Sequence, residues 1–161
     1  MYKISDNISY KEATKSYQAI KRGLDNTPDE NQLHAMRLTA KQIFQPVREH
    51  FKVPIAVTSF FRSPEVNKAV GGVSSSHHTK GQAIDVDADV YQQKLASGEV
   101  LTNKMIFDYI VENLDYDTVI WEFGTEDDPA WVHISYVRNN NRKRKLRAFR
   151  DWRGKTHYAK Y

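Results

Sequence analysis

The chain has 161 residues, the size of one ordinary domain, and its 40% hydrophobic and 27% charged residues predict a globular protein with a real core. It contains no cysteine, which excludes disulfides and a thiol nucleophile, so any metal must be held by His and carboxylates. The formal net charge is +4, no stretch approaches the ~20 apolar residues that span a bilayer, and residues 1–9 lack the basic and apolar regions of a signal peptide.

The first predicted helix follows Ser9. Ser9 and Glu12 form the pattern of a capping box, in which two side chains satisfy backbone N–H groups at the start of a helix. Apolar residues then recur at steps of three and four as far as Leu24, which is the spacing of one helical face. We therefore expect one helix over residues 10–24.

A second start signal lies at Thr27–Glu30, with Pro28 at the first helical position. Apolar residues at helical spacing predict that this helix continues to Phe51. Pro46 lies inside it and has no backbone N–H to donate, so a kink or a break is expected there.

The rest of the chain alternates short strands and helices. The predicted elements are a strand at 53–58, a helix from Ser63-Pro64 to Gly71-Gly72, a loop at 73–80, a strand at 82–88, a helix at 103–114, and strands at 118–123 and 131–137 joined by a turn-rich link at 124–129. Helices come first and strands later, which predicts an α+β fold with a small antiparallel sheet.

The basic residues gather at the C-terminal side of the chain. Residues 138–161 contain ten Lys and Arg and one acid, a charge of +9, whereas the remainder carries −5. This segment is a candidate anchor for a polyanion such as nucleic acid, teichoic acid or a membrane surface, and the alternative is a solvated tail. Four interleaved aromatic residues predict that part of it packs on the domain: Phe149, Trp152, Tyr158 and Tyr161.

Three polar side chains are candidates for a metal site. Asp85 and His133 each alternate with apolar residues in a predicted strand, so each faces away from the core. If both strands share one sheet, the two side chains project from the same face. His78 precedes Asp85 by seven residues, on a loop that Gly81 can fold back. Two imidazoles and a carboxylate leave a fourth position for water, as a catalytic zinc site requires.

The same residues carry a resemblance to a known family. The chain resembles the zinc D-alanyl-D-alanine carboxypeptidases and L-alanyl-D-glutamate endopeptidases that cut peptidoglycan stem peptides, in particular a subgroup that includes bacteriophage proteins. The resemblance spans roughly residues 1–137. Its motifs are Ser76-x-His78-x-x-Gly81-x-Ala83-x-Asp85, Trp131-x-His133, and the stretch Thr58–Ser63 with Asn67 and Gly71-Gly72.

The resemblance implies a fold and a ligand set. The fold would be that of the D-Ala-D-Ala metallopeptidases and hedgehog domains, with N-terminal helices packed on a small antiparallel sheet that carries zinc. His78, Asp85 and His133 would be the zinc ligands, in agreement with the argument from strand faces. His77 falls on an unspecified position of the motif, so we do not expect it to bind the metal.

Two further residues match the family's substrate site. Arg62 corresponds to the arginine that holds a substrate carboxylate or carbonyl, a task that suits its planar fork of donors, and an ordinary surface salt bridge is the alternative. Ser76 would orient the substrate or its own loop, with a simple turn hydroxyl as the alternative.

The general base departs from the family pattern. Many relatives place an acid three residues before the last histidine, and Ala130 stands at that position here. We expect Glu122 to be the base, because it is a charged residue in an otherwise apolar strand. Whether Glu122 shares the face of His133 depends on strand register. Asp127 and Asp128 on the following turn are the fallback, although both residue types also form turns.

The expected function is zinc-dependent hydrolysis of an amide bond in peptidoglycan stem peptides. Ala130 leaves open an alternative, a zinc-containing module that binds the wall without turnover. A domain over 1–137 and a basic segment over 138–161 are predicted, and the segment could hold the enzyme on an anionic wall polymer. A nucleic-acid partner is the weaker interpretation, since charge is its only signal. We expect synthesis in the cytoplasm, then release by lysis or as part of a virion, and action at the cell wall.

Overall fold

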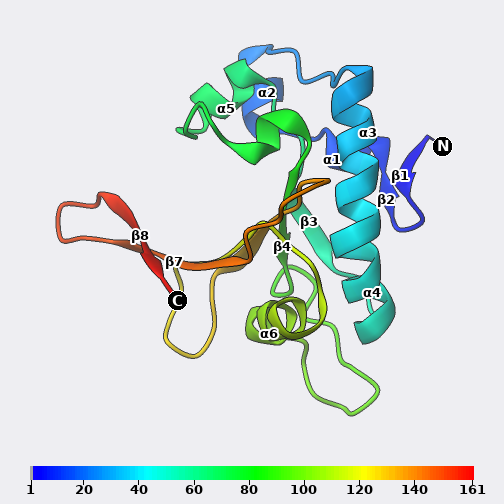
Figure 1. The fold of residues 1–161 in the computed structure, drawn as a ribbon, viewed down its shortest axis with the longest axis vertical. Helices are drawn as coiled ribbons and strands as arrows, with labels where there is room; N and C mark the ends of the chain where they lie inside the picture. Colours follow the sequence, from blue (N-terminus) through cyan, green and yellow to red (C-terminus); the bar gives the residue numbers. More distant parts are fainter. Residues whose placement is uncertain (1) are drawn as a thin grey trace.

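A six-stranded sheet forms the centre of the protein (Figure 1). The computed structural model describes residues 2–161, and the strands of this sheet follow the order β3-β4-β6-β5-β7-β8. A small hairpin, β1-β2, lies apart from it. The strands are β1 (Lys3–Ser5), β2 (Ile8–Ser9), β3 (Ala56–Ser59), β4 (Ala83–Asp87), β5 (Thr118–Glu122), β6 (Trp131–Ser135), β7 (Arg144–Arg150) and β8 (Thr156–Lys160).

Helices complete a mixed α+β structure. They are α1 (Tyr10–Ala13), α2 (Tyr17–Arg22), α3 (Glu30–Thr39), the π-helix η1 (Ala40–Phe44), α4 (Gln45–Phe51), α5 (Pro64–Ala69), the 3-10 turn η2 (His77–Lys80) and α6 (Asn103–Asn113). In Figure 1, α3 and α4 form one long column beside the sheet, and the β7-β8 hairpin projects from the body of the molecule. Within residues 2–161, no helix has both the length and the apolar character needed to cross a bilayer.

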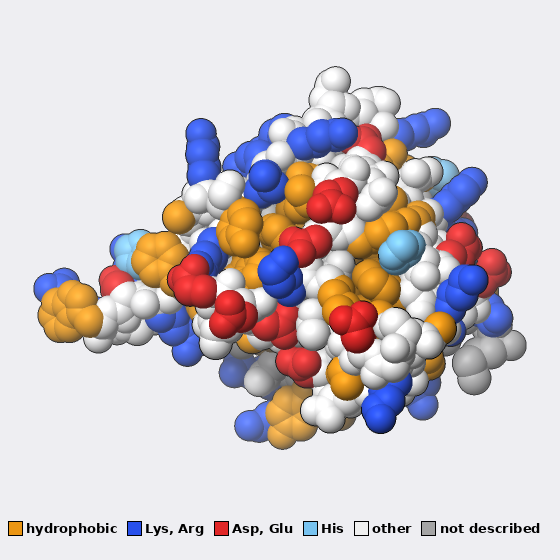
Figure 2. All heavy atoms as spheres, turned by 90° about the horizontal axis from the view of Figure 1, so that it is seen from below, with side chains coloured by type: hydrophobic (Ala, Val, Ile, Leu, Met, Phe, Trp, Pro, Cys, Tyr) orange, Lys and Arg blue, Asp and Glu red, His pale blue; other side chains and the backbone are white. Residues whose placement is uncertain are grey.

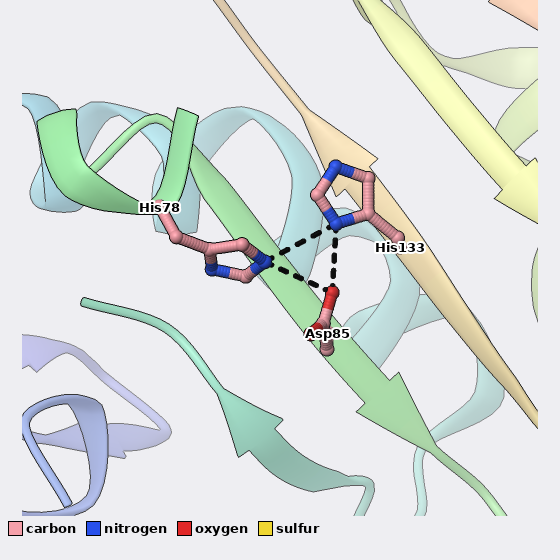
Figure 3. A group of neighbouring side chains, drawn as sticks. All are labelled: His78, Asp85 and His133. Carbon is pink, nitrogen blue, oxygen red and sulfur yellow. Dashed lines mark hydrogen bonds and ion pairs between the residues drawn. The ribbon is translucent and has the colours of Figure 1, made fainter. Parts of the chain in front are cut away.

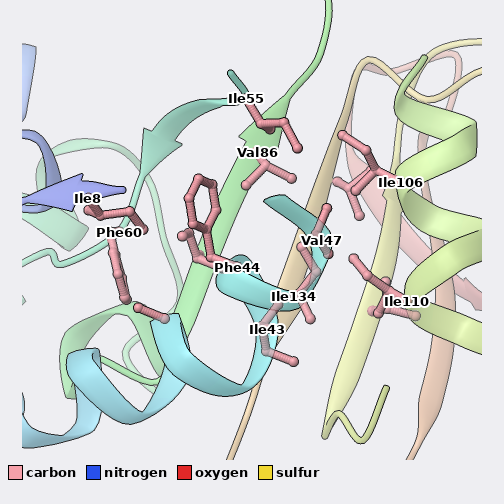
Figure 4. Close-up of a cluster of buried hydrophobic side chains, with 14 of the residues drawn as sticks. Ile8, Ile43, Phe44, Val47, Ile55, Phe60, Val86, Ile106, Ile110 and Ile134 are labelled. Carbon is pink, nitrogen blue, oxygen red and sulfur yellow. The ribbon is translucent and has the colours of Figure 1, made fainter. Parts of the chain in front are cut away.

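The core lies between the sheet and the helices α3, α4 and α6 (Figure 4). One face of the central strands is apolar, and Val86 and Ile134 on it are 3% and 0% exposed. They meet Val47 of α4 and Ile106 and Ile110 of α6, all buried. Burying a side chain of this size stabilises a protein by about 1.5–3 kcal/mol. The apolar residues are thus drawn to one face, which leaves the alternate positions of β4, β5 and β6 on the other.

The sheet is not purely antiparallel, so that part of the prediction is wrong. Every neighbouring pair is antiparallel except β5 and β7, which are parallel. Both edges of β6 are already paired, with β4 and β5, so the next strand cannot pair with β6 and instead extends the sheet beyond β5. Two hydrogen bonds from the guanidinium of Arg142 to the buried Asp117, of 2.8 and 2.5 Å, hold the chain as it returns to begin β7. The predicted division of the chain after residue 137 stays a prediction.

The single helix predicted over residues 10–24 is wrong. Ser9 does cap a helix, since its hydroxyl accepts a hydrogen bond from the backbone N–H of Glu12, but α1 ends at Ala13. The Ser16 hydroxyl accepts from the backbone N–H of Ala19 and starts the separate helix α2. Ile20, part of the predicted stripe, is 73% exposed. Its spacing is helical, but no other element covers that face.

The second predicted helix is present with a different start. Its N-cap is Asp29, which exchanges hydrogen bonds with Gln32 in a capping box, so Pro28 precedes the helix and is not its first residue. Before Pro46 the chain winds as the π-helix η1 and then continues as α4, with the proline in its first turn. A proline is tolerated there because its missing N–H costs least in a first turn. The remaining predicted helices and strands are confirmed to within three residues at each end, whereas the predicted loop at 73–80 ends in the 3-10 turn η2.

Candidate metal centre

Two of the predicted ligands lie side by side on the polar face of the sheet. Asp85 of β4 is the direct cross-strand partner of His133 of β6. Directly paired residues on neighbouring strands project to the same face, with Cβ atoms about 4.5–5.5 Å apart. The conditional prediction that both strands share a sheet and present these side chains together is therefore correct.

The turn η2 brings His78 to the same place. Gly81 ends this turn at a φ of +70°, a backbone conformation that residues other than glycine rarely adopt. A Cβ on Gly81 would also lie 2.6 Å from the backbone oxygen of Gln32 in α3, so the turn rests directly on that helix. The Ser76 hydroxyl accepts a hydrogen bond of 3.3 Å from the backbone N–H of His78. Ser76 therefore caps the turn, and its contact with substrate stays a prediction.

The three side chains point toward one another from η2, β4 and β6 (Figure 3). The Oδ1 of Asp85 lies 3.2 Å from the Nε2 of His78 and 2.8 Å from the Nδ1 of His133, and the two histidine nitrogens are 3.2 Å apart. Zinc bonds of about 2.0–2.1 Å at tetrahedral angles place donor atoms about 3.3 Å apart. The triangle thus fits a zinc ion with little adjustment. Within residues 2–161, no fourth His, Asp or Glu joins this group.

The neighbouring groups prepare the donors for a metal. The Nδ1 of His78 lies 2.6 Å from the carbonyl oxygen of Phe60, which can only accept, so Nδ1 carries the proton and Nε2 offers its lone pair. Burial lowers the pKa of His78 and favours the neutral ring. Burial opposes the charge of Asp85, but the neighbouring His78 and His133, in the protonated forms that a metal would displace, outweigh burial and hold the pKa of Asp85 well below its usual range. A neutral imidazole and a carboxylate are the forms that bind zinc.

Glu122 lies on the same face as the donors. In the pairing of β5 with β6, His133 is opposite Ile120, and Glu122 is two residues further along β5. Glu122 therefore projects from the face of His133 as its diagonal neighbour. It is only 7% exposed, and burial raises its pKa to about 7. The register that the sequence left open thus places Glu122 on the face that carries the three donors.

Arg62 lies beside this group. Its backbone N–H donates a hydrogen bond of 3.3 Å to the carbonyl of His78, which ties the segment after β3 to the turn η2. The Nε of Arg62 is buried and has no hydrogen-bond partner among residues 2–161. Burial lowers the pKa of Arg62, while the charges of Asp85 and Glu122 raise it. A buried donor without a partner is costly, so this N–H is available to a hydrogen-bond acceptor.

A comparison with family models decides the family of the chain. The model described as Peptidase M15 matches residues 6–135. The chain belongs to the M15 peptidase family. No curated protein matches the chain. M15 enzymes are zinc peptidases, so the His-Asp-His group of this chain is a potential metal site of that kind.

His77 and the turn acids lie outside this M15 site. His77 is directed to Asp117, 3.8 Å away, as expected for a residue that the metal motif does not specify. Asp128 accepts a hydrogen bond of 2.6 Å from the backbone N–H of Lys104 at the start of α6. Asp127 is exposed on the turn between β5 and β6. The structure therefore groups neither fallback base with the three metal donors.

Sequence reasoning missed the role of Phe60. Its carbonyl oxygen orients His78, but a main-chain oxygen leaves no trace in the side-chain pattern. The only available signal was the position of Phe60 inside the stretch Thr58–Ser63, which carries part of the family resemblance.

Proposed function

We propose that the protein is a zinc-dependent peptidase that hydrolyses an amide bond in peptidoglycan stem peptides. The observation that carries this proposal is the convergence of His78, Asp85 and His133, from three separate segments, at the spacing of zinc ligands. Membership of the M15 family supports the reaction class. When bound, zinc would act as a Lewis acid that polarises a carbonyl and lowers the pKa of water.

The residues of the chain supply the proton transfer and the substrate contact. Glu122 accepts a proton from the attacking water as the new C–O bond forms, and it delivers that proton to the leaving amine as the C–N bond breaks. A carboxylate with a pKa of about 7 suits both steps near neutral pH. Arg62 donates hydrogen bonds to a carbonyl or carboxylate of the peptide, and Ser76 holds the turn that carries His78.

The first experiment joins metal content to cleavage. The zinc-loaded protein is incubated with purified peptidoglycan and with a stem pentapeptide ending in D-alanyl-D-alanine, and the products are identified by mass spectrometry. We expect about one zinc per chain, with cleavage lost on chelation and restored by zinc. His133→Ala should lose both zinc and activity.

The matched control is His77→Ala, which removes an imidazole one residue from His78 but outside the donor triangle. It should keep zinc and most of the activity. Cleavage that survives complete removal of zinc would overturn the proposal. A zinc-loaded wild type that binds peptidoglycan without cutting it would favour the wall-binding module instead.

We also propose that the basic segment holds the enzyme on anionic wall polymers. Basic residues are exposed along the β7-β8 hairpin, and hydrophobic and basic side chains lie at its projecting tip (Figure 2). Binding to walls that carry teichoic acid should weaken as salt rises, because exposed charges are screened. Replacing Arg153 and Lys155 at the tip by Gln should also weaken binding to these walls. Equal binding to walls stripped of teichoic acid would contradict this role.

A further inference from the structure

The β7-β8 hairpin continues the polar face that carries the metal donors. Glu122 of β5 is paired with Ala148 of β7, and Ala148 is paired with Tyr158 of β8. The three residues form one transverse row, so their side chains project from the same face. This row begins at the proposed base and ends on the hairpin, outside the region 6–135 that matches the family model.

The spacing of the row brings the Tyr158 hydroxyl within reach of the site. Neighbouring strands lie about 4.8 Å apart, so the backbones of Glu122 and Tyr158 are separated by roughly 10 Å. The residue between them is Ala148, whose small side chain does not block the ring of Tyr158. Ala148 is only 1% exposed, whereas Tyr158 is 57% exposed. The tyrosine therefore keeps a surface free for a ligand at the end of the row.

The electrostatics of the site extend to this hydroxyl. Burial raises the pKa of Tyr158, the charges of Glu122 and Asp85 raise it further, and the charge of Arg62 opposes them. The phenol thus lies within the field of the site residues. It stays protonated at neutral pH and can donate a hydrogen bond.

The hairpin is anchored, so Tyr158 has a defined position. On the opposite face of the sheet, the ring of Tyr161 stacks on Trp121 with centroids 5.5 Å apart and lies 5.2 Å from the ring of Phe107. The backbone N–H of Phe123 donates a hydrogen bond of 3.1 Å to the carbonyl of Ala148. These contacts hold the hairpin to the core from both of its strands.

We propose that Tyr158 is a substrate-binding residue of this site, whose hydroxyl donates a hydrogen bond to a carbonyl or carboxylate oxygen of the peptide held by Arg62. This inference rests on the proposed function and adds to it a residue from the basic segment. The hairpin then has two tasks, since its exposed tip can meet the wall while Tyr158 contacts the peptide to be cut.

The test compares Tyr158→Phe with Tyr161→Phe. Each variant removes one hydroxyl from the same segment and keeps the ring, but Tyr161 packs on the opposite face of the sheet. Loss of one hydrogen bond to the substrate should raise KM for the stem pentapeptide about tenfold in Tyr158→Phe and leave kcat nearly unchanged. Zinc content and Tm should stay at wild-type values. Tyr161→Phe should match the wild type in KM, kcat, zinc content and Tm.

A second readout does not need turnover. Calorimetric binding of the stem pentapeptide to the zinc-free protein should be about tenfold weaker in Tyr158→Phe than in the wild type. The role of Tyr158 is overturned if the wild type and Tyr158→Phe have equal Kd and KM values. It is also overturned if Tyr161→Phe loses as much affinity as Tyr158→Phe. A zinc-loaded wild type that binds the pentapeptide without cleaving it overturns the proposed peptidase, while Tyr158 is still judged by Kd. A wild type that does not bind the pentapeptide overturns this inference.

Discussion

Glu122 is a buried carboxylate placed beside two potential metal ligands. Its ordinary pKa is 4.5, and burial raises it to about 7. Folding therefore favours the protonated form of Glu122. The resulting contribution to the free energy of unfolding is fully present below about pH 4.5 and is lost as the pH rises through about 7. In a stability-driven core such a residue would be replaced by an apolar one. Its presence in an otherwise apolar strand is what the proposed role as the base would explain.

The substitution Glu122→Gln separates this stability effect from catalysis. In the zinc-free protein, the variant should have a higher Tm than the wild type at pH 8 and a similar Tm at pH 4, because only the wild type must ionise a buried carboxyl. With zinc bound, the variant should lose at least a hundredfold in kcat. Thermal unfolding at the two pH values and cleavage kinetics measure both effects.

Asp127→Asn is the matched control, since Asp127 is an exposed acid on the turn that follows β5. It should change neither the pH dependence of Tm nor kcat. If Asp127→Asn abolishes turnover and Glu122→Gln does not, the assignment of the base is wrong.

At the scale of elements, the turn η2 depends on its contact with α3. Gly81→Ala combines a strained φ of +70° with a Cβ placed 2.6 Å from the backbone oxygen of Gln32 and 2.7 Å from the Cγ of Met36. The turn must move away from α3, and His78 moves with it. We expect the free energy of unfolding to fall by about 1–3 kcal/mol and zinc binding to weaken. Urea unfolding and zinc titration measure the two effects.

Gly23→Ala provides the control for backbone strain alone. Gly23 has a φ of +64°, close to that of Gly81, but nothing lies within 4 Å of the added Cβ. It should cost less stability and leave the zinc affinity unchanged. Equal zinc affinities in the two variants would show that the contact with α3 does not position His78.

At the scale of the whole molecule, zinc would tie together segments that are distant in the chain. The donors come from η2, β4 and β6, so the unfolded chain cannot present them at the observed spacing. Zinc at a free concentration of 100 times its Kd should add about 2.7 kcal/mol to the stability, which corresponds to a rise in Tm of roughly 5–10 °C for a chain of this size. Scanning calorimetry with and without zinc measures this shift.

His133→Ala should show almost no rise of Tm with zinc, because two donors remain. The comparison is made at zinc concentrations that saturate the control variant His77→Ala. If zinc does not raise the Tm of the wild type there, the idea that the three donors share one ion is contradicted.

The sequence alone predicted the three candidate metal donors and most of the elements around them. Asp85 and His133 were predictable because strands alternate strictly between two faces, so apolar neighbours identify the face of each polar residue. His78 and Gly81 were predictable from the spacing of a motif. These signals are local, and local geometry follows from the backbone whatever lies around it. The family followed from the same residues.

Only the tertiary structure decided which strands became neighbours and which faces were covered. The face of Glu122 depended on the register of β5 against β6, since a slip of one residue reverses every side chain. The helical stripe at Ile20 was real in the sequence, but burial depends on what another element covers. The parallel pairing of β7 with β5, and with it the row from Glu122 to Tyr158, depended on which free edge of the sheet the chain joined once both edges of β6 were occupied. Such pairings are settled by competition between distant segments, and no local pattern records the outcome.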